Sequence, residues 1–127
     1  MTHLDTSVLV DAFSGPTRTA LALRDMLERG ERVLVSAMAF YEWLRGPRRA
    51  DELAIQRTLV PDETVVPFGP VEAVLAAELY RRLPRARPRA ADLAIAACAL
   101  SRDAHLWTLN ADDFRDVPGL TLYTPRD

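Results

Sequence analysis

Short β-branched segments alternate with longer amphipathic segments along most of this chain, and this alternation restricts its fold more than any other feature. Strands are predicted at residues 3–5, 33–35, 64–68, 105–109 and 121–123, and helices at residues 21–29, 37–45, 51–59, 71–83 and 90–102. Strands that alternate with helices favour a mainly parallel sheet covered on both faces. A chain of 127 residues supports one core. We therefore expect a single domain, residues 1–127, with an α/β fold of three layers, α/β/α, around a sheet of roughly five strands.

Capping and stop residues mark some of the helix ends. Ser36 is expected to cap the helix that follows it, and Gly46 with Pro47 ends that helix. Ser7 is expected to cap a helix after the first strand, which begins at His3 and ends near Asp5. In the helix after Ser36, the predicted apolar stripe consists of Ala37, Phe40, Tyr41 and Leu44, with Glu42 pointing away from it.

Four acids lie where predicted elements begin or end: Asp5, Glu42, Asp92 and Asp113. Asp5 ends the first strand and Asp113 follows the fourth, while Glu42 and Asp92 lie on helices entered from the same edge. Ligands bind outside the carboxyl ends of the strands in open parallel sheets. The four acids could therefore share one rim of the sheet.

A cluster of carboxylates at that rim would form a site for divalent metal ions. Two anions ~4 Å apart repel each other by on the order of 4 kcal/mol at an effective dielectric of 20, so the cluster requires a cation. Mg²⁺ or Mn²⁺ prefers such hard oxygen ligands, whereas two histidines and one cysteine suit zinc poorly. Metal-dependent cleavage of a phosphodiester is the leading chemistry, by activation of bound water. Four polar residues are expected to orient the acids by hydrogen bonds: Thr6, Ser7, Thr108 and Asn110.

Each acid also has an ordinary structural explanation. Asp92 in a first helical turn could satisfy free amides, Glu42 could be a solvated helix residue, and Asp113 could be a turn acid. Asp5 differs, because an aspartate inside an apolar strand end is costly to bury without a partner. The four residues as a set are thus more informative than each alone.

The basic residues are all arginine. The net charge is −2, so a nucleic acid would have to bind to a local patch. Five arginines cluster before Asp92 and are predicted to contact the phosphate backbone of a nucleic acid: Arg81, Arg82, Arg85, Arg87 and Arg89. The arginines that follow Glu42, which are Arg45, Arg48 and Arg49, could extend the same surface. A solvated helix end is the other explanation of this cluster. Most aromatic residues are expected in the core, as is the lone Cys98, and no apolar run is long enough to span a membrane, which makes the cytoplasm the expected location.

Four blocks of sequence together resemble a PIN domain, and more narrowly the VapC toxins of bacterial toxin-antitoxin pairs. They are LDTSVLVD from Leu4, Tyr41-Glu42, ADLAIAA from Ala91, and TLNADDF from Thr108, followed by Pro118-Gly119-Leu120. The resemblance covers the whole chain in order and implies that Asp5, Glu42, Asp92 and Asp113 form the catalytic metal site, with Thr6 and Asn110 in support. It leaves open whether Asp112 is also a ligand.

The resemblance further implies an Mg²⁺- or Mn²⁺-dependent endoribonuclease that cleaves structured RNA, such as transfer or ribosomal RNA, and so inhibits translation. It also implies a homodimer neutralised by a cognate VapB-type antitoxin. A receiver domain is excluded because the chain has no lysine, and a haloacid dehalogenase phosphatase would need a second acid at Ser7. A PIN-fold binding module without catalytic activity remains the alternative.

Overall fold

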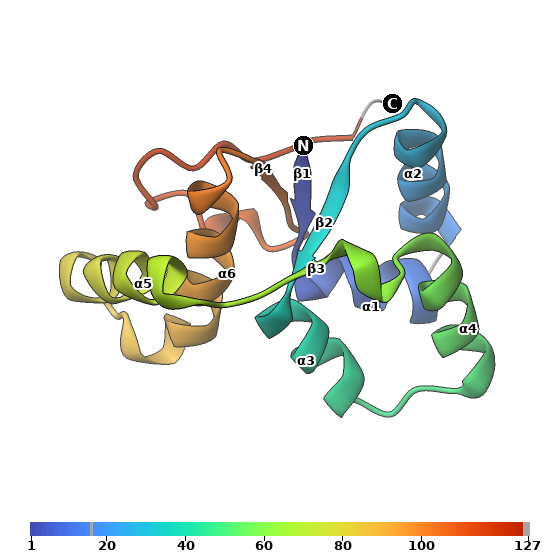
Figure 1. The fold of residues 1–127 in the computed structure, drawn as a ribbon, viewed down its shortest axis with the longest axis horizontal. Helices are drawn as coiled ribbons and strands as arrows, with labels where there is room; N and C mark the ends of the chain where they lie inside the picture. Colours follow the sequence, from blue (N-terminus) through green and yellow to red (C-terminus); the bar gives the residue numbers. More distant parts are fainter. Residues whose placement is uncertain (16, 126–127) are drawn as a thin grey trace.

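The computed structural model, which describes residues 1–15 and 17–125, contains a four-stranded, fully parallel sheet. Its strands lie in the order β3 (Val65–Val66), β2 (Val33–Ser36), β1 (Thr2–Leu4) and β4 (His105–Trp107). Leu4 of β1 is aligned with Val35 on one side and with Trp107 on the other. The carboxyl ends of these three strands therefore meet at one edge, from which α1 and α3 start (Figure 1).

Helices cover both faces of the sheet. They are α1 (Thr6–Ser14), α2 (Thr17–Glu28), α3 (Ala37–Arg45), α4 (Ala50–Leu59), α5 (Pro70–Arg82) and α6 (Ala90–Ser101), with single 3₁₀ turns η1 (Asp62–Thr64), η2 (Arg87–Arg89) and η3 (Ala111–Asp113). Helices α5 and α6 lie on one side of the sheet, and α1, α2 and α4 lie on the other (Figure 1). The predicted three-layer α/β/α fold is confirmed. Within the described residues, every helix is too short or too polar to cross a membrane.

Helix α6 forms the centre of the core. All seven residues from Leu93 to Ala99 are buried, which confirms the prediction of a helix enclosed on most sides. Small alanine side chains let this helix approach the sheet and α5 closely. Cys98 lies on it as a buried free thiol, and burial raises the pKa of that thiol to about 11. It acts as a small apolar residue, as expected.

The predicted cap of α3 is confirmed, but the predicted stripe is wrong at Tyr41 and Leu44, whereas Phe40 packs against the core as expected. Ser36 Oγ accepts a hydrogen bond from the Ala39 amide at 3.1 Å. The buried residues of α3 are Ala39 and Trp43, whereas Tyr41 is 57% exposed and Leu44 is 48% exposed. Because α3 follows β2 with no intervening loop, the strand's exit direction fixes which face of the helix meets the core. Trp43 then packs edge-on against Phe13 and donates its indole N–H to Gln56.

The sheet is also smaller than predicted. The expected fifth strand, residues 121–123, contributes only an isolated parallel bridge between Leu106 and Leu122. The strand predicted at residues 105–109 stops at Trp107, because Thr108 makes side-chain contacts at the sheet edge instead. Helix α5 agrees with its predicted range, yet Val71 and Val74 face solvent while Glu72 and Leu79 are buried.

Candidate active site

Asp5 is held where the ends of β1 and β4 meet. It is 4% exposed, and its backbone amide donates to the Trp107 carbonyl at 2.9 Å. Its Oδ2 atom accepts hydrogen bonds from the hydroxyls of Ser7 at 2.8 Å and Thr108 at 2.7 Å. Asp5 itself is the N-cap residue of α1, so the prediction that Ser7 caps this helix is wrong. The buried carboxylate has the partners that its burial requires.

The same two hydroxyls also fix the chain that leaves β4. Ser7 Oγ accepts from the Leu109 amide, and Thr108 Oγ1 accepts from the Asn110 amide, each at 3.0 Å. Each hydroxyl therefore joins Asp5 to the backbone of the following loop. The predicted supporting residues Ser7 and Thr108 are thus in direct contact with Asp5.

Glu42 reaches the site from α3. Thr6, in the first turn of α1, donates its hydroxyl to Glu42 Oε1 at 2.7 Å. Arg45, one turn further along α3, approaches Glu42 Oε2 at 3.4 Å. The side chain of Glu42 is only 18% exposed. Thr6 therefore draws the carboxylate of Glu42 toward the α1 end that Asp5 caps.

Three of the four predicted acids line one pocket of about 580 Å³. They are Asp5, Glu42 and Asp92, and they come from three elements that are distant in sequence. The predicted supporting residues Thr6, Ser7 and Asn110 line the same pocket. Each of these six residues supplies oxygen atoms as donors or acceptors.

The charge of this pocket is most evident at Asp92, in the first turn of α6. Its pKa is raised from 3.8 to about 6, first because it is buried, and then because Asp5, Asp113 and Glu42 are negatively charged. The positive charge of Arg89 acts in the opposite direction. The acids are thus close enough to repel each other, as expected for a cluster that lacks a cation.

Asp113 lies beside the pocket without lining it. It is exposed on η3 and borders a separate hollow of about 370 Å³ together with Asn110 and Asp112. Its charge nevertheless acts on Asp92. Asp112 forms an ion pair with Arg115 in which both side chains are largely exposed. The structure therefore assembles three acids in one pocket and places the fourth at its margin.

The donor set of the pocket fits a hard divalent cation. Carboxylate, hydroxyl and amide oxygens are the ligands that Mg²⁺ and Mn²⁺ prefer, and the pocket offers no thiolate or imidazole. Across residues 1–15 and 17–125, no three acidic, histidine or cysteine side chains already converge as a ready set of metal ligands. The carboxylates therefore have to move closer together to coordinate an ion.

One acidic residue of the pocket was not predicted from the sequence. Asp11 lines the pocket together with the predicted acids. Asp11 lies one helical turn after Ser7, and residues four apart share a helix face. That spacing was the signal by which Asp11 could have been found. Arg45 and Arg48, which follow Glu42 and were expected to extend the surface of the arginine cluster, line the pocket as well.

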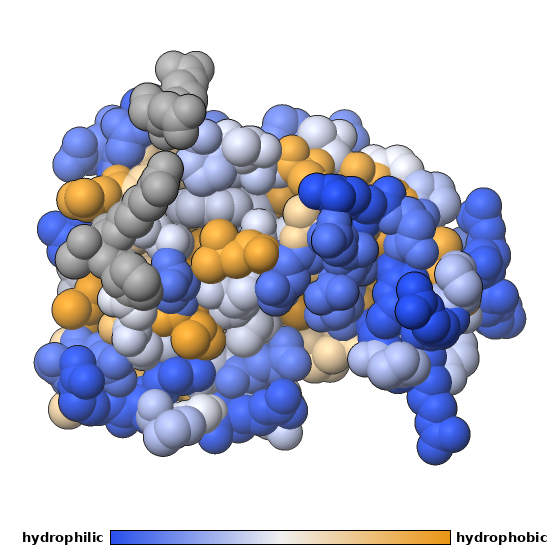
Figure 2. All heavy atoms as spheres, turned by 180° about the vertical axis from the view of Figure 1, so that it is seen from behind, coloured by the Kyte–Doolittle hydropathy of each residue, from blue (hydrophilic) through white to orange (hydrophobic). Residues whose placement is uncertain are grey.

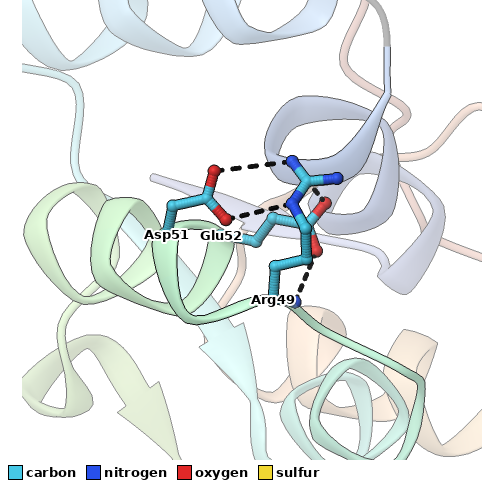
Figure 3. Close-up of polar contacts among 3 residues, drawn as sticks. All are labelled: Arg49, Asp51 and Glu52. Atoms are coloured by element: carbon cyan, nitrogen blue, oxygen red, sulfur yellow. Dashed lines mark hydrogen bonds and ion pairs between the residues drawn. The ribbon is translucent and has the colours of Figure 1, made fainter.

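The arginines after Glu42 differ in how they are engaged. Arg48 donates to the Trp43 carbonyl at 2.8 Å and lies over its ring at 4.1 Å. Arg49 pairs with Asp51, and its backbone amide donates to Glu52 at the start of α4 (Figure 3). Arg45 is 58% exposed, at the pocket rim. It is the one of these three best placed to meet a ligand.

The predicted RNA-binding arginines lie outside the pocket lining. Four of them are exposed at the end of α5 and in the segment after it: Arg81, Arg82, Arg85 and Arg87. Figure 2 shows strongly hydrophilic residues gathered over this end of the molecule. Arg89 differs from them, because it forms an ion pair with Asp116 and its side chain is only 16% exposed.

Comparison with known proteins agrees with this fold. The family model of the PIN domain matches residues 3–120, and the chain belongs to this family. It is 29% identical to Ribonuclease VapC19 of Mycobacterium tuberculosis over 127 residues, covering 94% of this chain and 97% of the relative.

Solved structures share the fold, and two of them illustrate the similarity. A toxin-antitoxin complex from Klebsiella pneumoniae superposes with a TM-score of 0.72 at 23% identity, covering 100% of this chain and 99% of that one. VapBC2 from Rickettsia felis, solved bound to a DNA fragment from its promoter, superposes with a TM-score of 0.70 at 20% identity and 96% coverage of both chains.

Proposed function

We propose that this PIN domain is a metal-dependent endoribonuclease and the toxin of a toxin-antitoxin pair. The observation that carries the proposal is the pocket in which Asp5, Glu42 and Asp92 meet at the carboxyl edge of the sheet. The similarity to a ribonuclease over nearly the full length of both chains supports RNA as the substrate.

In this proposal the acids Asp5, Glu42 and Asp92 hold Mg²⁺ or Mn²⁺, and Asp113 joins them from η3. The bound ion supplies Lewis acidity, which polarises the phosphate and lowers the pKa of the attacking water. Ser7 and Thr108 orient Asp5, and Thr6 orients Glu42, so that these two carboxylates need only a small further movement to hold the ion. One of these four acids would also accept the proton of the attacking water.

Exposed arginines are proposed to bind the RNA backbone. Arg45 lies at the pocket rim, where it would contact a phosphate next to the one that is cleaved. Arg81, Arg82, Arg85 and Arg87 would contact the backbone further along the strand. Such contacts are independent of base sequence, so selection of structured RNA, such as transfer or ribosomal RNA, would depend on the shape of the substrate.

The biological setting is proposed from the relatives. Structures of the same fold come from a toxin-antitoxin complex and from VapBC2, which supports a VapB-type antitoxin as partner. A homodimer that acts in the cytoplasm and inhibits translation completes this proposal. Exposed apolar side chains on α3 and α5, such as Tyr41, Leu44, Val71 and Val74, provide surface that protein partners would cover.

Cleavage of total RNA by purified protein tests the catalytic proposal. We expect the wild type to degrade RNA with Mg²⁺ and not with EDTA, and we expect Asp5→Ala to be inactive in both conditions. Asp25→Ala, which removes an exposed acid on α2, serves as the matched control. Equal RNA loss with wild type and Asp5→Ala would point to a contaminating nuclease. Failure of the wild type to cleave any RNA would favour the non-catalytic binding module.

A further inference from the structure

Arg89 differs from the other arginines of its cluster in how completely it is bonded. It ends η2 and is the N-cap residue of α6, three residues before Asp92. Its Nη1 atom donates to the Pro84 carbonyl at 3.1 Å and to Asp116 Oδ2 at 3.0 Å. Its Nη2 atom donates to the Asp113 carbonyl at 2.9 Å and to Asp116 Oδ1 at 2.5 Å.

These four bonds use all four hydrogens of the two terminal nitrogens, since a guanidinium has five N–H groups and one of them is on Nε. A side chain bonded in this way has little capacity left for a phosphate. The sequence prediction that Arg89 contacts RNA therefore competes with an internal role that already occupies the same atoms.

The internal role concerns the position of the fourth acid. The backbone of Arg89 starts the helix that carries Asp92, and its side chain holds the carbonyl of Asp113 and the carboxylate of Asp116. One guanidinium thus links the first turn of α6 to the loop that contains Asp113. The paired geometry with Asp116 requires the planar fork of arginine, which lysine does not have.

We propose that Arg89 is a positioning residue of the acidic site, which holds Asp113 at a fixed place relative to Asp92 so that both can reach one metal ion. This inference rests on the proposed metal site and extends it to a residue that touches neither metal nor RNA. It also explains how Asp113, which does not line the pocket, is kept beside it.

Mn²⁺ binding in the absence of RNA tests this inference, measured by calorimetry on wild type, Arg89→Gln, Arg89→Lys and Asp116→Asn. Loss of a positive charge next to a cation site would by itself tighten Mn²⁺ binding. For Arg89→Gln, positioning predicts the opposite sign: we expect this variant to weaken Mn²⁺ binding about 10-fold, the low end for partners that orient metal ligands. Asp116→Asn should weaken Mn²⁺ binding as well, but there the loss of a negative charge acts in the same direction, so Arg89→Gln is the variant whose sign decides. Arg89→Lys should also weaken Mn²⁺ binding, because lysine keeps the positive charge but lacks the planar guanidinium that pairs with Asp116.

Arg115→Gln is the matched control, since it removes a positive charge that forms an exposed ion pair on the same loop. We expect its Mn²⁺ affinity to be unchanged or slightly higher. Thermal melting of each variant establishes that the binding measurement is made on folded protein, and Asp116→Asn, which alters a partly exposed residue, provides a second variant that breaks the same link.

The positioning role would be overturned if Arg89→Gln or Arg89→Lys bound Mn²⁺ with wild-type affinity. It would also be overturned if the wild type bound no Mn²⁺. The proposed function fails separately. If the wild type binds Mn²⁺ and the variants bind it more weakly, but no RNA is cleaved, Arg89 still positions the metal site and the ribonuclease assignment alone is wrong.

Discussion

Thr108 donates its hydroxyl hydrogen to Asp5 Oδ2 at 2.7 Å, although the two residues are 103 positions apart in sequence. This bond crosses from the end of β4 to the end of β1 and is buried. The same hydroxyl accepts from the Asn110 amide. Thr108 therefore couples the orientation of the central acid to the path of the loop that carries Asp113.

Replacing Thr108 with valine should impair both stability and catalysis. Valine keeps the shape of threonine and leaves Asp5 with one buried hydrogen bond fewer, which costs about 1–3 kcal/mol. Loss of orientation should lower kcat/KM for RNA by about 10- to 100-fold. Thr108→Ser keeps the hydroxyl and should retain most of both properties. Urea unfolding and cleavage kinetics test this, and a valine variant as active as the serine variant would contradict it.

Replacing Asp92 with asparagine should stabilise the metal-free protein at neutral pH. The pKa of Asp92 is raised in the folded state from 3.8 to about 6, so protonation favours folding. That stabilisation is fully present below pH 3.8 and is lost as the pH rises through 6. At pH 7.5 with EDTA, the free energy of unfolding of the wild type should therefore be lower than that of Asp92→Asn, by up to about 3 kcal/mol. The difference should shrink toward pH 4.5 in urea unfolding, and one that does not change with pH would exclude this cause.

His3 should make the protein less stable in acid. It is fully buried in β1, and burial, Arg102 and the N-terminal amine lower its pKa from 6.5 to about 4. The unfolded chain therefore takes up a proton near pH 6.5 that the folded protein accepts only near pH 4. Stability should fall across this window, by up to about 3 kcal/mol.

The test compares two proteins that both carry Asp92→Asn, one with His3 and one with His3→Leu. The Asp92→Asn background removes the titration of Asp92, whose effect on the pH dependence of stability has the opposite sign. Urea unfolding between pH 7 and 4.5 should show a smaller loss of stability in His3→Leu. Neither ring nitrogen of His3 has a hydrogen-bond partner within the described residues, so leucine should also stabilise the protein at pH 7. Parallel pH dependences in the two proteins would contradict the role of His3.

The exposed arginines should account for part of the salt dependence of RNA binding. Replacing Arg81, Arg82, Arg85 and Arg87 with glutamine should weaken binding to single-stranded RNA and make its dependence on log salt concentration shallower, by about 0.7 per lost phosphate contact. Binding is measured in an Asp5→Asn background, so that the RNA stays intact. Arg57→Gln, which removes an exposed arginine on α4, is the control. An unchanged slope would leave these four residues as a solvated helix end.

The sequence was most informative about the acids and least informative about their surroundings. Asp5 and Glu42 could be found because each lies shortly after the end of a strand, and parallel strands bring such ends together. Asp92 follows a helix and a 3₁₀ turn instead, and the resemblance to PIN domains was needed to single it out. The contacts of Asp113 could not be found, because they depend on Arg89 and Asp116, which are 27 residues apart and join two irregular segments. No periodic pattern relates such residues.

The fold was predictable where the apolar pattern of an element allows only one way to bury it. The buried run from Leu93 to Ala99 is an example, since a helix without a polar face has to lie in the interior. The stripe of α3 was wrong at Tyr41 and Leu44 because two apolar sets are available on that helix, and the partners Phe13 and Gln56 of Trp43 decide which one is buried. These partners come from α1 and α4, and the helical pattern of α3 contains no information about them.

The strand order β3-β2-β1-β4 has a consequence for synthesis of the protein. The first strand made is central, and its neighbour β4 is the last to be translated. A nascent chain on the ribosome therefore contains Asp5 long before it contains Thr108, the residue that holds Asp5 in place. Pairing of such distant segments has to await almost the whole chain. For the proposed ribonuclease, the acidic pocket can be completed only after the message has been read nearly to the end of this domain.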